Sequence, residues 1–291
     1  MCDQDHFEED LSKYLRQPLT RRQFGAFSVG AGMAMMLPRA ADALDVTESE
    51  VTVMTPDGMA DCYFVHPGSG KYPGVLVWPD ILGLRPAFRK MGRRLAESGY
   101  SVLVVNPFYR QKHAPVVPEG ASFADEKTRN AVMPLAQALN ATTHMTDARA
   151  FVTYLDSQAA VDKTKKIGTT GYCMGGPMVF RTVGTLPDRV GAGASFHGGG
   201  LVTKNPDSPH LLIPQMRASL LIAIAENDDQ RAPDDKNVLR EHFDKAKVPA
   251  EIEVYAGAAH GWTVPQSEVY HQAQAEKAWA RLLATFGKAL A

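Results

Sequence analysis

Cysteine is scarce in this 291-residue chain, which contains three: Cys2, Cys62 and Cys173. Neither a C-x-x-C nor an H-E-x-x-H segment is present, so the sequence offers no recognisable zinc site. We expect no metal and no cofactor. A disulfide between Cys62 and Cys173 stays open as an alternative, although a domain of this size needs no covalent link to hold its core.

An excess of one charge is also lacking, since the net charge is -1 at pH 7. With no basic run, the sequence does not suggest a nucleic-acid partner. The uncharged stretch 24–37 would span about 21 Å as a helix, short of the ~30 Å hydrocarbon core, so a stable membrane span is not expected. We therefore expect a small-molecule substrate. We expect the protein to be a monomer or a small homo-oligomer.

The first 43 residues differ from the rest and contain the paired arginines Arg21 and Arg22 before the uncharged stretch. The segment 41–43 reads Ala-Asp-Ala, a small-residue cleavage pattern. Together these features resemble a twin-arginine export signal, although Gly25 departs from its usual pattern. We therefore expect a signal segment over 1–43 and a periplasmic or otherwise exported protein, cytoplasmic if the signal does not function.

From Val51 onward, strand-like and helix-like segments alternate. Apolar runs such as GVLVW (74–78), bounded by Gly and Pro, suit strands buried on both faces. Such alternation predicts an α/β fold with a mostly parallel sheet and helices on both faces, as a single domain over 44–291. The expected strands are 51–54, 62–66, 74–78, 101–106, 166–171, 191–196, 219–225 and 251–257; the expected helices are 85–99, 142–157, 174–185, 234–247 and 267–287.

The segment GYCMGG places Cys173 between a predicted strand and a predicted helix. A G-x-nucleophile-x-G turn in this position is a nucleophile elbow, where Gly171 and Gly175 avoid collisions with neighbouring backbone. The helix N-terminus would favour a thiolate, and the Met174 N–H would face a developing oxyanion. A small buried cysteine in a glycine-rich turn is the alternative.

An acid and a histidine follow Cys173 at later strand ends. Asp228 and Asp229 come after the strand 219–225, and His260 comes after the strand 251–257. A nucleophile of this type needs a base, and the base needs an orienting acid, in this chain order. Separately, the aspartates could be turn or N-cap residues and the histidine a loop residue. FHGGG (196–200) follows the nucleophile, so it is not a lipase-type oxyanion segment; we expect a tight loop bordering the site.

The chain resembles the dienelactone hydrolase family of α/β-hydrolases over roughly residues 50–290. The resemblance implies Cys173 as nucleophile, His260 as base and Asp228 as the orienting acid. Asp229 remains an alternative acid, because it keeps the family's spacing to Pro233. The matching segments are GVLVWPDILGL, NPFYRQ, GYCMGG, AEND and AAHGW.

The resemblance also implies roles for residues around the nucleophile. Asp80 stands where the family has a glutamate that holds the resting thiol, and the Ile81 N–H would be the second oxyanion donor. Arg110 matches an arginine that binds a substrate carboxylate, whereas Val264 occupies the place of a second such arginine. Trp262 either lines an apolar acyl or alcohol pocket or packs in the core.

The predicted function is cofactor-free hydrolysis of an ester or lactone through a Cys-His-Asp triad and a thioester acyl-enzyme. A dienelactone hydrolase-like enzyme of this kind is a carboxymethylenebutenolidase or a related carboxylesterase. Two other readings stay open. One is an inactive family member that binds a carboxylate through Arg110, and the other is a thiol redox protein that uses Cys173.

Overall fold

All eight predicted strands are present and form one sheet. The computed structural model describes residues 43–291, and its strand order is β1-β2-β4-β3-β5-β6-β7-β8. The first two pairings, β1 with β2 and β2 with β4, are antiparallel, and all others are parallel. The predicted mostly parallel sheet is therefore confirmed. Its strands are β1 (Val46–Thr55), β2 (Gly58–Pro67), β3 (Gly74–Trp78), β4 (Ser101–Val105), β5 (Ile167–Tyr172), β6 (Val190–Phe196), β7 (Ser219–Ala225) and β8 (Ala250–Tyr255).

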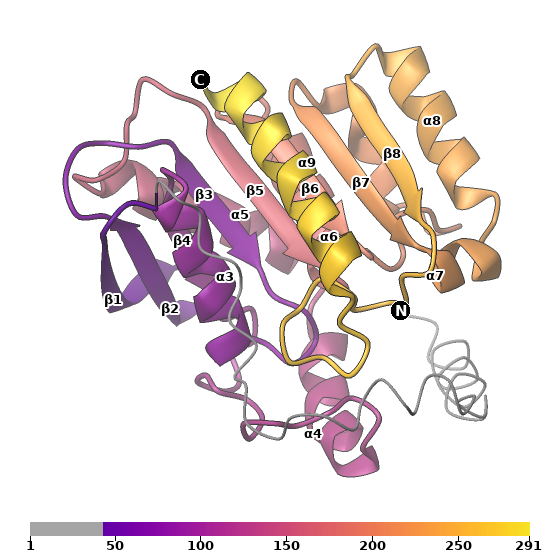
Figure 1. The fold of residues 1–291 in the computed structure, drawn as a ribbon, viewed down its shortest axis with the longest axis horizontal. Helices are drawn as coiled ribbons and strands as arrows, with labels where there is room; N and C mark the ends of the chain where they lie inside the picture. Colours follow the sequence, from indigo (N-terminus) through magenta and orange to yellow (C-terminus); the bar gives the residue numbers. More distant parts are fainter. Residues whose placement is uncertain (1–42) are drawn as a thin grey trace.

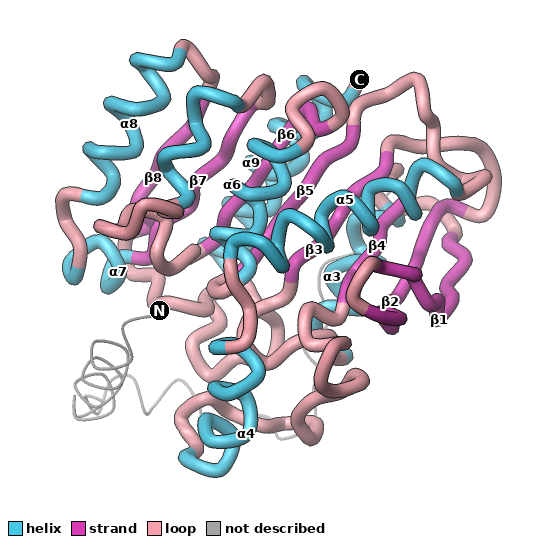
Figure 2. The backbone as a smooth tube through the Cα atoms, turned by 180° about the vertical axis from the view of Figure 1, so that it is seen from behind, coloured by secondary structure: helices cyan, strands magenta, loops and turns pink. Residues whose placement is uncertain are grey.

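Helices cover both faces of the sheet, and each face has its own apolar core. In Figure 1, α3 and α9 lie on the near face; seen from behind, α5, α6 and α8 cover the other (Figure 2). The central strands β3, β4 and β5 are buried along their whole length, as their continuous apolar or small residues require. The helices are α3 (Pro86–Glu97), α4 (Glu126–Gln137), α5 (Ala141–Ser157), α6 (Gly175–Thr185), α7 (Glu226–Arg231), α8 (Asp235–Ala246) and α9 (Gln272–Leu290), with a 3-10 helix η1 (Pro209–Gln215).

Two helix starts show how local sequence sets these boundaries. Pro86 occupies the first turn of α3, where the missing N–H costs nothing. The Asn140 side chain accepts from the Thr143 N–H at the start of α5, and the Thr143 hydroxyl accepts in return from the Asn140 N–H. This reciprocal capping box satisfies two backbone donors that the helix itself cannot.

Three helical segments were not predicted, and one begins later than expected. The missed segments are α4, η1 and α7, and α9 starts at Gln272 instead of residue 267 because residues 264–271 form turns, with Gln266 at φ +70°. The helix α4 lies apart from both helical layers, beyond the carboxyl ends of the parallel strands (Figure 1). With the loop before it, α4 builds a small separate apolar cluster that includes Phe108, Val116 and Val132.

The predicted export signal lies outside the described residues, apart from its last position. Within 43–291, no helix combines the length and the apolar character needed to cross a bilayer.

Candidate active site

Cys173 stands on a strained turn between β5 and α6. Its φ is +52°, a left-handed conformation that residues with a side chain rarely adopt. A Cβ at Gly171 would lie 2.2 Å from the Gly175 carbonyl oxygen, and one at Gly175 would lie 2.4 Å from the Trp78 carbonyl oxygen. Both positions must therefore be glycine, which is the steric reason for the G-x-C-x-G pattern. The Cys173 side chain is partly exposed at this turn.

The structure brings His260 and Asp228 together at the same sheet edge. His260 follows β8, Asp228 lies in the first turn of α7, and His260 Nδ1 is 2.7 Å from Asp228 Oδ2. Asp229, the alternative acid, points elsewhere: both its carboxylate oxygens accept from Lys236 Nζ. Of the two adjacent aspartates, Asp228 contacts the imidazole and Asp229 contacts Lys236.

Nε2, the second nitrogen of His260, is the one that Asp228 leaves unoccupied. Nε2 is buried and makes no hydrogen bond of standard geometry within the described residues, although Cys173 is near enough to act on the ring. Burial by itself lowers the pKa of His260, but the charges of Asp228 and Cys173 outweigh it and raise that pKa well above the usual value. Asp228 and Cys173 thus both favour the protonated form of the His260 ring.

The two backbone N–H groups expected to bind the oxyanion, those of Ile81 and Met174, make no hydrogen bond in the described part of the chain. Met174 is the N-cap residue of α6, and neither its N–H nor that of Ile81 takes part in a hydrogen bond. In the turn after β3, Asp80 Oδ1 accepts from the Leu82 N–H, and the Asp80 carbonyl accepts from the Gly83 N–H. This arrangement leaves the Ile81 donor between them available.

The Asp80 carboxylate is engaged by an arginine of its own loop. Arg85 Nη1 donates to Oδ1 at 2.6 Å and Nη2 donates to Oδ2 at 2.8 Å. Such a bidentate pair fixes the carboxylate geometry more firmly than a single contact. Within residues 43–291 no hydrogen bond joins Asp80 to Cys173, so the thiol-holding role that the resemblance implies stays a prediction.

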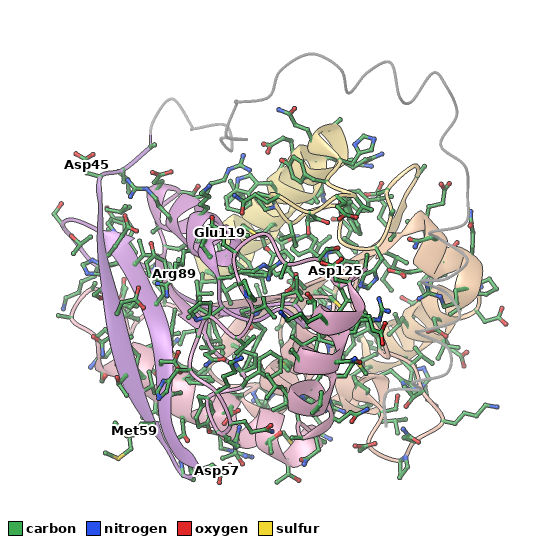
Figure 3. All side chains as sticks on the ribbon, turned by 90° about the horizontal axis from the view of Figure 1, so that it is seen from below. Asp45, Asp57, Met59, Arg89, Glu119 and Asp125 are labelled. Carbon is green, nitrogen blue, oxygen red and sulfur yellow. The ribbon has the colours of Figure 1, made fainter. Side chains whose placement is uncertain are left out.

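Arg110 is enclosed by two carboxylates. Its Nη1 and Nη2 donate to the two oxygens of Asp147, at 2.8 and 2.7 Å, and Nε and Nη2 donate to Asp57. Asp147 is 1% exposed and also accepts from the Tyr109 hydroxyl. Asp57 lies at the tip of the β1–β2 hairpin, beside Met59 (Figure 3). The nitrogens of this guanidinium are all committed within the protein.

Trp262 and Val264 are both buried. Trp262 is 0% exposed, and its ring centroid lies 5.2 Å from that of Tyr255 and 5.2 Å from that of His197. Val264 is 1% exposed in the same core. In this conformation Trp262 packs in the core, which was one of the two roles expected for it.

Cys62 and Cys173 are free thiols, one in β2 and the other on the turn after β5. Cys62 lies in β2, which β4 and β3 separate from β5. Three inter-strand spacings of about 4.8 Å give a separation of about 14 Å, whereas a disulfide needs Cα atoms within about 7 Å. Burial raises the pKa of Cys62. This geometry disfavours a redox pair, and within 43–291 no cluster of side chains suits a metal ion.

Several residues that the sequence analysis did not single out hold the histidine loop. Asn227 Oδ1 accepts from the His260 N–H at 2.9 Å, and Glu226 Oε2 accepts from the Gly257 N–H. His197, which lies in the FHGGG segment expected to border the site, contacts Thr263. The run Glu226-Asn227-Asp228 is the sequence signal for these contacts, since consecutive polar side chains at a strand end often accept hydrogen bonds from the backbone of a nearby loop.

The fold and this sheet edge define the class of protein. A mostly parallel eight-stranded sheet with a strained strand–helix turn, followed by an acid and a histidine after later strands, is an α/β-hydrolase. The profile of the dienelactone hydrolase family matches residues 60–290. The chain therefore belongs to that family of carboxylic ester hydrolases.

Relatives cover most of the chain at low identity. A protein of Synechocystis sp. is 26% identical over 247 residues, which is 84% of this chain and 97% of its own. The carboxymethylenebutenolidase of Rhodococcus opacus is 25% identical, over 78% of this chain and 86% of its own. A crystal structure from Klebsiella pneumoniae has a TM-score of 0.71 at 20% identity, covering 84% of this chain and 99% of that chain. At this identity the structural likeness establishes the fold alone.

Proposed function

We propose that this protein hydrolyses carboxylic esters or lactones through a Cys173–His260–Asp228 triad. The single observation that carries the proposal is the position of His260. Its Nδ1 contacts Asp228 at 2.7 Å, its buried Nε2 has no other partner in the described residues, and Cys173, on a strained elbow, is close enough to raise the pKa of the ring. Burial alone would lower the pKa of His260, but Asp228 and Cys173 raise it well above its usual value, which makes the imidazole a stronger base toward the thiol.

The residues supply each proton that the reaction needs. His260 takes the thiol proton, the sulfur attacks the carbonyl carbon, and the tetrahedral oxyanion collapses as His260 returns the proton to the leaving alkoxide. In the second half His260 removes a proton from water, the hydroxide attacks the thioester, and the thiolate leaves with the carboxylic acid as product. Asp228 keeps the imidazole oriented throughout.

The backbone donors of Ile81 and Met174 would stabilise the oxyanion. Neither N–H makes a hydrogen bond within residues 43–291; Met174 follows Cys173 directly, and Ile81 stands where the family resemblance implies the second donor. Preorganised donors of this kind contribute about 2.7–4 kcal/mol each in comparable sites. No metal or cofactor takes part in this sequence of steps.

The substrate class is bounded by the groups available for its binding. The Rhodococcus opacus relative is named for a lactone that bears a carboxylate. In this chain Asp57 and Asp147 occupy Arg110, and Val264 is an apolar residue. We therefore favour an uncharged ester or lactone; a carboxylated substrate would reach Arg110 only by displacing the more exposed partner, Asp57.

The test is hydrolysis of 4-nitrophenyl esters and of simple lactones by the full chain. Cys173→Ala and His260→Ala are each expected to lower kcat by at least about 10³-fold, because triad members act as a unit. Unchanged turnover in either variant would exclude the triad. Far-UV circular dichroism of both variants provides the control for folding.

Export is a separate part of the proposal. The paired arginines Arg21 and Arg22 support a periplasmic destination for the folded enzyme, with cleavage near Ala43. Fractionation of cells that express the full chain should place wild-type protein in the periplasm and the Arg21→Lys/Arg22→Lys variant in the cytoplasm. Equal periplasmic yield of the two would count against a twin-arginine route.

A further inference from the structure

A second histidine, His197, lies directly beneath the site. It follows β6, is 1% exposed, and has a φ of +41°, so its backbone is held in the left-handed region that a side-chain-bearing residue seldom adopts. Its own N–H donates to the Ala223 carbonyl at 2.8 Å. Strain of this kind persists only where surrounding contacts enforce it, and it is concentrated at functional sites.

The imidazole of His197 connects the two loops that hold the nucleophile and the base. Its Nδ1 accepts from the Cys173 N–H at 3.1 Å, sharing that donor with the Phe196 carbonyl at 3.0 Å. Its Nε2 is 3.0 Å from the Thr263 hydroxyl oxygen, three residues beyond His260. A single side chain therefore links the elbow after β5 to the loop after β8.

These contacts fix the tautomer of His197. A backbone N–H can only donate, so Nδ1 must be unprotonated and the ring proton must sit on Nε2, where it is donated to Thr263. Burial, and then the proximity of His260, hold the pKa of His197 well below its usual value. The ring is accordingly neutral, and it keeps its acceptor free for Cys173.

The same ring also forms one wall for the base. The centroids of His197 and His260 are 4.9 Å apart with the rings inclined at 60°, and the Trp262 ring packs against His197 at 5.2 Å. Rotation of His260 toward the protein interior would meet this ring. His197 thus restricts His260 by packing and Cys173 by hydrogen bonding.

We infer that His197 is a positioning residue for the proposed triad, which holds the Cys173 backbone and the His260 loop in register. The inference rests on the proposed function. No hydrogen bond joins the His197 ring to the sulfur or to the His260 ring in the described residues, so it acts through its neighbours. Displacement of a reacting group by about 1 Å can lower the rate ~10²-fold. We expect loss of the His197 link to allow a displacement of that size.

The test compares two variants that both tolerate the left-handed backbone. His197→Asn keeps an acceptor oxygen near the position of Nδ1, and His197→Gly removes the side chain entirely. We expect His197→Gly to lower kcat by about 10–100-fold with KM within about twofold, and to slow alkylation of Cys173 by iodoacetamide in parallel. For both kcat and the alkylation rate, His197→Asn should restore at least half of the decrease in log(rate) that His197→Gly causes.

A matched control is available elsewhere in the fold. His210 is also buried, contacts a hydroxyl (Ser208, 2.7 Å) and packs against a second histidine, His242, with centroids 4.8 Å apart. His210→Leu should lower the urea midpoint while kcat stays within about twofold of wild type. Loss of packing alone would make His197→Gly behave in the same way.

The outcomes separate the two claims. If Cys173→Ala is inactive but His197→Gly retains wild-type kcat, the triad stands and the positioning role is wrong. If Cys173→Ala remains active, the proposed function itself fails. Equal kcat for His197→Asn and His197→Gly would also overturn the role of the acceptor. Should His197→Gly not fold, Thr263→Val replaces it: the inference predicts a lower kcat and slower alkylation, and wild-type values for both would refute it.

Discussion

Asp228 and Asp229 are neighbours in the sequence with different tasks in the structure. The first turn of α7 rotates successive side chains by about 100°, so one carboxylate meets His260 and the other meets Lys236. The strand end predicts an acid at this position, but not which of two adjacent acids. That choice depends on the helical conformation of six residues that contain no apolar side chain to reveal it.

Substitution of each aspartate in turn tests which of the two supports His260. Asp228→Asn keeps the shape of the side chain but removes the charge that supports the imidazolium, so kcat should fall by about 10²–10⁴-fold. Asp229→Asn weakens only a lysine contact and should leave kcat within about threefold. Steady-state kinetics on one neutral ester distinguishes them, and the reverse ranking would assign the acid to Asp229.

Arg110 yields a prediction about substrate charge. Asp57→Asn removes the more exposed of its two partners and leaves the bidentate contact with Asp147 intact. For a substrate that carries a carboxylate, such as mono-4-nitrophenyl succinate, KM should then fall several-fold, whereas KM for 4-nitrophenyl butyrate should not change. If neither KM changes, Arg110 is a structural residue that does not contact substrate.

The elbow between β5 and α6 sets the position of Cys173. Gly175→Ala would place a methyl group 2.4 Å from the Trp78 carbonyl oxygen, where only backbone movement can relieve the clash. We expect a loss of about 2 kcal/mol or more in the free energy of unfolding. Because the movement displaces Cys173, kcat should also fall by at least about tenfold.

A glycine in α9 provides the control for this element. A Cβ at Gly287 meets no atom within 4 Å, and the residue lies inside a helix. Gly287→Ala should therefore be neutral or stabilise the protein by up to about 1 kcal/mol. Urea unfolding of both variants checks the pair; a tolerated Gly175→Ala would show that the elbow is not under steric constraint.

The elements were predictable where their sequence periodicity is strong. The strand GVLVW and the glycine-bounded helix α3 follow from apolar patterning alone. The helix α4 was missed because Pro134 interrupts it and its buried face consists of only Thr128, Val132 and Leu135. The sequence predicts that α9 starts at residue 267, whereas the helix starts at Gln272. The turns at 264–271 depend on a left-handed Gln266 that no local pattern signals.

Contacts between distant elements were the least predictable part of the site. Arg110 is expected to face a substrate, but Asp147, on α5, is buried beside it, and no local pattern in the sequence signals that contact. The position of His197 beneath Cys173 likewise depends on the packing of β6 against β5 and on a strained turn. Pairings of this kind arise from tertiary packing, which a local sequence pattern does not encode.

At the scale of the whole molecule, buried neutral histidines make folding sensitive to acid. His144 is 7% exposed, and burial, followed by Arg181 and Arg110, lowers its pKa to about 3; the pKa of His197 is also depressed. Below about pH 6.5 the unfolded chain binds protons that these native side chains do not accept. Stability must therefore fall as pH falls, by about 2 kcal/mol at pH 5 for His144 alone.

The acid effect can be measured by urea unfolding at pH 7 and pH 5. His144→Asn keeps an acceptor for Arg181 Nη1 but cannot titrate, so its loss of stability between the two pH values should be smaller than that of wild type by about 2 kcal/mol. Identical pH dependence in the two proteins would contradict a neutral His144. His260, whose pKa is raised, contributes in the opposite sense: its stabilisation is complete below about pH 6.5 and is lost as pH rises through its native pKa.

In the proposed mechanism Cys173 carries the acyl group during turnover. The most direct measurement is mass spectrometry of the full chain, quenched in acid within the first turnover of 4-nitrophenyl acetate and digested to locate the adduct. We expect one acetyl group on the peptide that contains Cys173, and none in Cys173→Ala. Rapid hydrolysis by wild type with no acetyl group on that peptide, or full activity in Cys173→Ala, would contradict it.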